Sequence, residues 1–405
     1  MSQSSDSLKD AMAGSSDWSE VSVFREAFRA WLEENLPAGW RHRSFGASDE
    51  RVLELRREFG ARLGCDGWLS VAWPSAHGGL GLGGNHRLAV LEELTRAGAP
   101  EPMNSNALGI FAPTLMKFGT PEQCTRLLAP MVRHELLWCQ GFSEPGAGSD
   151  LASLKTRGEI TADQIVITGQ KVWTSYAHTA QYCYILVRTE QAPRKQQGIS
   201  LVALPMDQPG VTVRPILNMV GTSEFCEVFL EDAVAPIENL IGVPGEGWQM
   251  ASFALAQERS IGLAQRSLKL LSEFESLARV AEEQRGLGNP VISEEFFAAD
   301  LVDRYVRARV VEATVRRIVE ADANGSDIAQ LSSVAKIWWS EGHQLQVDLA
   351  MRMLNAQAMR GAGDEGNWWK ALLWSRAETI YGGTGQVQRN ILARGLGMPR
   401  DGGRS

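Results

Sequence analysis

The amino-acid sequence predicts a multidomain α+β protein, with helices at both ends of the chain and a β-rich middle. Three observations predict this order. Helical spacing of apolar residues begins at Val21, short runs of β-branched and aromatic residues occupy positions 158–236, and long helical patterns resume at Gly247. A length of 405 residues is enough for two to three domains at about 150 residues each, without disulfides or metals to hold a small core together.

The N-terminal region is predicted to be helical. Its first 17 residues contain neither an apolar run nor an arginine, so we expect residues 1–18 to form a disordered tail rather than a secretory signal. The first helix is predicted to end before Pro37 and Gly39, and further helical patterns cover residues 53–63, 88–96 and 121–137. The apolar residues that share one face of that first helix are Val21, Phe24, Phe28, Trp31 and Leu32.

The middle of the chain is predicted to form short strands. Residues 158–190, 198–205, 210–216 and 226–236 are rich in β-branched and aromatic residues and are separated by Gly and Pro. No helical pattern lies between these runs, which favours an antiparallel barrel or sandwich over a parallel α/β sheet. The chain then becomes helical again, with patterns over residues 248–281, 294–323, 328–354 and 368–381.

Charge and cysteine content exclude several classes of protein. The 40 Lys and Arg residues against 48 Asp and Glu residues give a net charge of −8, which argues against nucleic acid or an anionic membrane surface as the main partner. The five cysteines fit neither a disulfide framework nor paired metal ligands, and they suggest a reducing cytoplasm. The six histidines form no cluster with metal-ligand spacing, and no run of 18 apolar residues occurs, so we predict neither a zinc site nor a membrane span.

Residues 79–84 match the GxGxxG pattern of dinucleotide-binding loops, but their context differs. The stretch before them is short and broken by Pro74, and no second strand follows the next helix, as a βαβ unit would require. We therefore predict a glycine-rich turn between helices. The pairs Trp338–Trp339 and Trp368–Trp369 are predicted to be packing residues within helices.

The most informative segment is CQGFSEPGAGSD at 139–150, which is followed by GQKVWTS at 169–175. Three glycines and a proline beside two hydroxyl groups suit a loop that exposes backbone N–H groups and lets a flat, polar-edged ring approach closely. A β-hairpin with a polar turn also explains this spacing. The residues by themselves leave both interpretations open.

The segment closely resembles the signature of the acyl-CoA dehydrogenase flavoprotein family, and so does IYGGTGQVQR at 380–389. With the motifs at 73–79 and 245–248, the resemblance covers residues 20–398 in the family's order. It implies an N-terminal all-α domain at 19–135, a middle β domain at 136–238 and a C-terminal four-helix-bundle domain at 239–405.

The resemblance also implies a reaction and its components. In this family an α-proton is removed from an acyl-CoA thioester while a β-hydride passes to N5 of FAD. It further implies fatty acid metabolism, an electron-transfer flavoprotein as electron acceptor, and a homotetramer, a homodimer or a heteromer with a related subunit. By the same resemblance Ser143, Ser149, Trp173, Thr174, Ser175, Thr384 and Gln386 contact the flavin or the substrate, with Phe142 and Gly148 in the same loop as Ser143.

The catalytic base is the main departure from the family pattern. Many members have a Glu directly after the Tyr of the C-terminal motif, but this chain has Gly382 there, and glycine cannot take a proton. Some relatives carry the base on the first long helix of the third domain, where this chain has Glu258. Its helical neighbours at three and four residues are apolar or small, so we expect burial to favour the neutral acid, as suits a general base near neutral pH. An ion pair with a distant Arg in the helical core is the alternative.

Arg259, Arg285 and the loop at 354–361 also differ from the family pattern or match it only in part. Arg259 is a candidate contact for a substrate phosphate or carbonyl, although a salt bridge explains it equally well. Arg285 is the nearest match to the family's flavin-contacting Arg, in a shortened stretch, and the loop at 354–361 replaces the usual Gly-Gly loop. Two other functions therefore stay open: a non-catalytic subunit of a heteromeric dehydrogenase, or a related flavin oxidase, monooxygenase or carrier-protein desaturase. The sequence does not indicate the acyl group.

Overall fold

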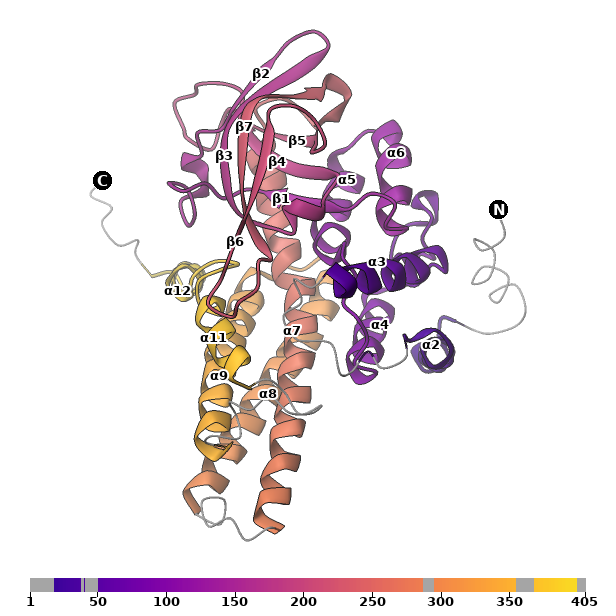
Figure 1. Ribbon diagram of the computed structural model, residues 1–405, viewed down its shortest axis with the longest axis vertical. Coiled ribbons are helices and arrows are strands. Elements are labelled where there is room, and N and C mark those ends of the chain that lie inside the picture. The colour runs from indigo at the N-terminus through magenta and orange to yellow at the C-terminus, as the bar shows by residue number, and fades with distance from the viewer. Residues whose placement is uncertain (1–17, 38–39, 41–49, 287–294, 355–367, 399–405) are drawn as a thin grey trace. The chain divides into compact units, whose positions relative to one another are not determined.

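The computed structural model describes residues 18–37, 40, 50–286, 295–354 and 368–398 (Figure 1). They form two compact units. Of the described residues, the first unit contains Trp18, 50–82 and 100–258, and the second contains 19–37, 40, 83–99, 259–286, 295–354 and 368–398. The predicted tail lies outside the described residues except for Trp18, which is buried and whose ring stacks on Trp68 at 5.8 Å.

Helices of the first unit largely follow the predicted pattern. Helix α3 spans Glu50–Cys65, and α6 (Pro121–Val132) begins at a reciprocal capping box between Thr120 and Gln123. Helix α6 ends before the predicted residue 137, because His134 takes a φ of 55° and the chain turns toward a strand. The helical stretch over 107–118, which includes α5 (Ala112–Phe118), was not predicted. Its first six residues are all buried, so they show no amphipathic period.

The middle region forms a sheet of eight strands (Figure 1). Hydrogen-bonded neighbours follow the order β6-β7-β3-β2-β4-β5-β8, and β1 pairs with β4. The predicted antiparallel pairing holds for most neighbours but is wrong for two pairs, since β1 and β2 each run parallel to β4. Connections long enough for a crossover separate these strands along the chain. The strands are β1 (Trp138–Gly141), β2 (Arg157–Ile160), β3 (Gln164–Ser175), β4 (Tyr182–Arg188), β5 (Ile199–Pro205), β6 (Val211–Ile216), β7 (Phe225–Pro236) and β8 (Leu240–Ile241).

The two faces of the sheet bury different sets of side chains. Strand β4 alternates between them: Tyr184 and Leu186 belong to one core, and Cys183 and Ile185 to the other. The core on the Tyr184 face also contains side chains from residues 107–132 and from the start of α7 (Gly247–Gly286). This face therefore packs the first turns of α7, as far as Ala254 and Leu255, in the same core as the sheet within the first unit.

The second unit is helical. Two apolar clusters hold it together, one centred on Val311 and Trp339 and the other on Leu349 and Trp368. Each predicted Trp pair thus has one fully packed member, while Trp338 is 37% exposed with Arg307 over its ring. The helices are α2 (Val21–Asn35), α4 (Gly84–Arg96), the remainder of α7, α8 (Glu295–Ala323), α9 (Ala329–Leu354), α11 (Trp368–Glu378) and α12 (Gly385–Gly395).

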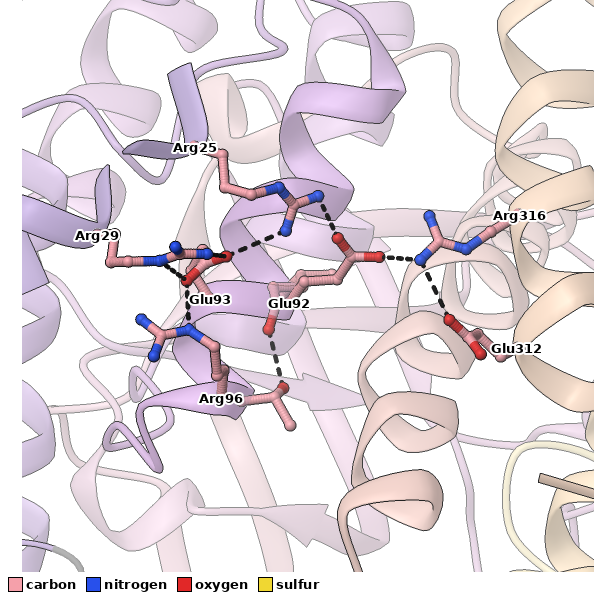
Figure 2. Close-up of polar contacts among 9 residues, drawn as sticks. Arg25, Arg29, Glu92, Glu93, Arg96, Glu312 and Arg316 are labelled. Atoms are coloured by element: carbon pink, nitrogen blue, oxygen red, sulfur yellow. Dashed lines mark hydrogen bonds and ion pairs between the residues drawn. The ribbon is translucent and has the colours of Figure 1, made fainter. Parts of the chain in front are cut away.

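An ion-pair network joins α2, α4 and α8 in the second unit (Figure 2). Glu93 is 2% exposed and accepts hydrogen bonds from Arg25, Arg29 and Arg96. Burial disfavours its charge, but these guanidinium groups outweigh burial and lower the pKa of Glu93 to about 2. Ion pairs therefore link α4, the helix that follows the glycine-rich turn at 79–84, to α2 and α8. No strand precedes that turn in the described chain, which agrees with the predicted turn.

None of the helices in the described ranges combines the length and the apolar character that crossing a bilayer requires.

Candidate active site

The loop after β1 contains several predicted site residues in the first unit. Phe142 is buried and Ser143 half-buried, while Gly148 and Ser149 are exposed. Glu144 and Ala147 exchange two main-chain hydrogen bonds of 3.0 and 3.1 Å, which close a tight turn. A Cβ placed on Gly148 would meet nothing within 4 Å, so the outer side of this turn is open.

A buried ion pair supports this loop from beneath. Lys171 of β3 is 0% exposed, and its Nζ donates to Glu144 Oε1 at 2.8 Å and to the Phe142 carbonyl at 3.2 Å. The Glu144 carboxylate also accepts from the backbone N–H groups of Lys155 and Thr156. Burial raises the pKa of Glu144, but Lys171 and these donors outweigh it and hold that pKa below its usual value. Sequence analysis did not identify this pair, because its members belong to different motifs.

The end of β3 presents the second group of predicted residues next to the loop. The Val172 N–H donates to the Ser143 carbonyl at 3.0 Å, and the pairing of β3 with β7 is irregular between Lys171 and Thr174. At this irregularity Trp173 has a φ of 61°, a strained conformation for a bulky residue, and its indole is 61% exposed. Backbone strain that holds a large aromatic ring in solvent is typical of functional sites.

Thr174 and Ser175 complete this group. Thr174 is 0% exposed, and its Oγ1 has no hydrogen-bond partner among the residues that the structure describes. Ser175 is half-buried. After them the chain is anchored by Tyr176, whose hydroxyl accepts a 2.9 Å hydrogen bond from the buried Arg56. We refer to residues 142–149 and 173–175 as the first signature region.

Glu258 ends the first unit's portion of α7. It lies one helical turn after Ala254, a buried member of the core that also contains Phe142. Its side chain is half-buried, and in the described part of the chain no ion pair or hydrogen bond involves it. The alternative prediction was an ion pair between Glu258 and a distant Arg. No Arg among the described residues pairs with it. The side chains of Arg259 and Arg285 lie outside the described residues, as do residues 355–361 of the predicted interface loop.

The C-terminal motif belongs to the second unit and is described by itself. We refer to residues 378–389 as the second signature region. Gly382 and Gly383 have φ angles of 62° and 89°, and the buried Gln388 amide donates to both of their carbonyls. Thr384 caps α12 by accepting from the Val387 N–H at 3.2 Å, and Gln386 is exposed.

A buried charged cluster that the sequence did not reveal lies beside this motif. His343 of α9 is 4% exposed, with Nδ1 2.7 Å from Glu378 Oε2 and Nε2 3.0 Å from Glu273 Oε2. Burial favours the neutral imidazole, but the two carboxylates outweigh it and raise the pKa of His343 to about 10. Burial also disfavours the Glu273 charge, but His343 and Lys269 outweigh it and lower the pKa of Glu273 to about 2. No group of three or more potential metal ligands occurs among the described residues.

The first signature region has the features that a flat heteroaromatic cofactor requires. It offers an exposed indole, a buried hydroxyl without a partner among the described residues, three serine hydroxyls and a turn with open space around its glycines. The structure thus brings Phe142, Ser143, Gly148, Ser149, Trp173, Thr174, Ser175 and Glu258 into one unit, whereas Thr384 and Gln386 lie in the other.

Comparison with known proteins covers nearly the whole chain. Acyl-CoA dehydrogenase IpdE1 of Mycobacterium tuberculosis is 39% identical over 390 residues, which is 94% of this chain and 99% of that protein. IpdE1 of Mycolicibacterium smegmatis is 36% identical over 400 residues, again 94% of this chain and 99% of that protein.

Solved structures agree with these relatives. The Tcur3481-Tcur3483 steroid ACAD aligns with a TM-score of 0.83 at 30% identity, over 94% of this chain and 98% of its own. The ChsE4-ChsE5 complex from Mycobacterium tuberculosis aligns with a TM-score of 0.81 at 28% identity, over 94% and 98%. Family models for the N-terminal, middle and C-terminal domains of acyl-CoA dehydrogenases match residues 19–135, 139–233 and 245–397. With the order of helical, β and helical regions that the sequence predicted, these matches show that the chain belongs to the acyl-CoA dehydrogenase family.

Proposed function

We propose that this protein is an FAD-dependent dehydrogenase that introduces an α,β double bond into an acyl-CoA thioester, with Glu258 as the base. One observation carries the assignment of the base. Glu258 is a half-buried carboxylate on a largely apolar helix face, without an ion-pair partner among the described residues, in the same unit as the first signature region. A carboxylate in such a setting is available to take a proton from a ligand.

The residues of the first signature region are the proposed flavin contacts. We propose that Trp173 packs on the ring, that Thr174, Ser175 and Ser143 hydrogen-bond its polar edge, and that Ser149 lies near the thioester. Bound FAD would supply the acceptor for the β-hydride. We propose that Thr384, Gln386 and Arg285 contact the dinucleotide part, and that Arg259 contacts the substrate.

The protein's own contribution is to hold the base and exclude water. Ala254 and Leu255 precede Glu258 on α7 and pack in or against the apolar core, so Glu258 follows apolar side chains on this helix. We propose that the electrons then pass to an electron-transfer flavoprotein in a reducing cytoplasm, a setting that suits the five free cysteines.

For the acyl group we propose a bulky, steroid-derived thioester in place of the simple fatty acyl chain that the family resemblance first implied. Support comes from the name of one similar structure, the Tcur3481-Tcur3483 steroid ACAD. Comparing flavin reduction by a steroid side-chain thioester with reduction by a straight-chain acyl-CoA tests this proposal. Faster reduction by the straight chain would contradict it.

The test of the base uses the full-length, FAD-loaded protein. Anaerobic mixing with acyl-CoA is expected to bleach the flavin, and Glu258→Gln is expected to slow this step by at least about 100-fold with FAD still bound. Glu275→Gln, an exposed change on the same helix, is the matched control and should behave like the wild type. Full activity in Glu258→Gln would overturn the assignment. Rapid oxygen consumption by the reduced protein would instead indicate an oxidase or monooxygenase.

A second candidate is a subunit of a heteromeric dehydrogenase. Two similar structures carry names that pair two chains, Tcur3481-Tcur3483 and ChsE4-ChsE5. Gly382 in the usual base position also suits a chain that relies on a related subunit for the catalytic base. Light scattering and flavin absorbance of the chain purified alone discriminate: a flavin-loaded homodimer or homotetramer favours the first proposal, and a flavin-poor chain that gains flavin with a related subunit favours the second.

A further inference from the structure

Arg266 on α7 has a half-buried guanidinium group without an acidic partner among the described residues. It forms no ion pair with them, and its N–H groups donate no hydrogen bond to them. Its Cζ lies 5.1 Å from the centroid of the Trp339 ring and 5.1 Å from that of the Tyr381 ring. Ring faces attract a cation but do not use the hydrogen-bond donors at the edge of a guanidinium, so these donors stay available to a ligand.

A second cation shares the same two rings. Lys336 of α9 is 2% exposed, and its Nζ lies 4.9 Å from the Trp339 centroid and 5.1 Å from the Tyr381 centroid. This ammonium group donates a hydrogen bond to the Glu378 carbonyl. Lys336 is therefore buried and already bonded to the protein, and Arg266 is the one of these two cations that a ligand can reach.

The helix leaves room beside the guanidinium. Gly262 precedes Arg266 by about one helical turn, and long side chains on a helix lean toward its N-terminus. A Cβ built on Gly262 would meet the Arg266 guanidinium at 4.0 Å and nothing nearer. The second signature region does not neutralise this charge, because its Glu378 carboxylate is already bound to His343.

The setting of Arg266 favours a carboxylate over a phosphate. A guanidinium presents a planar fork of donors that matches the two oxygens of a carboxylate. Phosphate groups in proteins usually rest on several backbone N–H groups, at a helix N-terminus or in a glycine-rich loop. Arg266 lies well inside α7, with the rings of Trp339 and Tyr381 beside it, which suits a carboxylate on a largely apolar molecule.

We propose that Arg266 is a specificity-determining residue that binds a carboxylate on the acyl part of the substrate. The preferred substrate is then a thioester whose acyl group bears a second, free carboxylate. This inference rests on the proposed function, since it assigns a substrate class to the same dehydrogenase. The apolar body of such an acyl group would pack on the aromatic rings while its carboxylate accepts two hydrogen bonds from the guanidinium.

The test compares two CoA thioesters of one steroid-derived dicarboxylic acid, with the second carboxylate either free or blocked as a methyl ester. Binding is measured from the change in flavin absorbance in full-length, FAD-loaded Glu258→Gln protein, which is expected to bind without turnover. The free acid should bind about tenfold more tightly than the ester, and adding Arg266→Gln should remove this preference by weakening binding of the free acid alone. Arg266→Lys keeps the charge but loses the planar fork, so it should retain only part of the preference.

Turnover gives a second measurement. In protein that retains Glu258, Arg266→Gln should raise KM for the free acid about tenfold with little change in kcat, because the lost contact binds ground state and transition state alike. Arg279→Gln is the matched control, since it removes an exposed arginine from the same helix, and it should leave both affinities and both KM values unchanged.

Three results overturn the inference. They are an equal loss of affinity for both thioesters in Arg266→Gln, no loss for either, or a fall in FAD affinity, which would indicate a cofactor phosphate at the guanidinium. Full flavin reduction in Glu258→Gln contradicts the base assignment and leaves the role of Arg266 standing. The two failures are therefore distinguishable.

Discussion

The two signature regions differ in how their polar groups are hydrogen-bonded. In the first signature region several groups are available to a ligand. Thr174 Oγ1 lacks a hydrogen-bond partner among the described residues, Trp173 is 61% exposed, and space surrounds Gly148. In the second signature region two side chains bond to the main chain, although the buried Gln388 Oε1 has no hydrogen-bond partner among the described residues. Gln388 holds the carbonyls of the two glycines, and Thr384 caps α12.

This difference indicates where chemistry is expected. A group that is already satisfied within the protein has little to offer a ligand, whereas an unpaired buried hydroxyl gains from one. The carbonyls of Gly382 and Gly383 and the start of α12 are therefore held by bonds within the second unit. The available groups of the first signature region lie in the first unit, as does Glu258, which has no ion-pair partner among the described residues.

Removing the ion pair beneath the first signature region should have the largest effect. Lys171→Met leaves the Glu144 carboxylate buried without its cation, so the free energy of unfolding should fall by about 3–5 kcal/mol in urea titrations. Lys195→Met is the control, since Lys195 pairs with Asp150 at the surface and should cost no more than about 1 kcal/mol. Equal losses in the two variants would show that the buried pair does not hold the loop.

Alkaline pH should selectively weaken the second signature region. The pKa of His343 is raised to about 10, so its contribution to stability is complete below the usual value of 6.5 and is lost as the pH rises toward 10. Glu273, with a pKa of about 2, contributes above 4.5 and loses its contribution as the pH falls toward 2. Between pH 6.5 and 10 the free energy of unfolding should therefore decline by about 1.4 kcal/mol per pH unit.

His343→Gln should abolish that alkaline decline and lower stability near pH 6.5, because Glu378 then stays buried without its cation and Glu273 keeps only Lys269. His77→Gln, in a turn of the first unit, is the control and should leave the slope intact. A wild-type protein whose stability is flat from pH 6.5 to 10 would contradict the charged state assigned to this cluster.

A pair of threonine variants gives the smallest but most direct test. Thr174→Val removes a hydroxyl without a described partner, so flavin-free stability should change by less than about 0.5 kcal/mol while flavin affinity falls about tenfold. Thr384→Val removes a helix cap and should cost about 1 kcal/mol of stability. Thermal unfolding and flavin titration measure both. If Thr174→Val destabilised the flavin-free protein as much as Thr384→Val, the hydroxyl would already have a structural role.

Sequence patterns predicted most helices, because the pattern of a helix depends on residues only a few positions apart. The apolar spacing from Val21 places α2, and the helical pattern predicted over 121–137 begins at the first residue of α6, without any knowledge of the rest of the chain. The helical stretch over 107–118 and the parallel pairing of β4 escaped prediction. The first is largely buried and lacks a period, and the second depends on strands distant along the chain.

The sequence alone determined the family, the order of helical and β regions, and the absence of a carboxylate at position 382, since motifs and turn residues are local. Only the tertiary structure decided which buried charges are neutralised. Lys171 and Glu144 are 27 residues apart, and His343 and Glu378 are 35 apart, so no spacing rule could pair them.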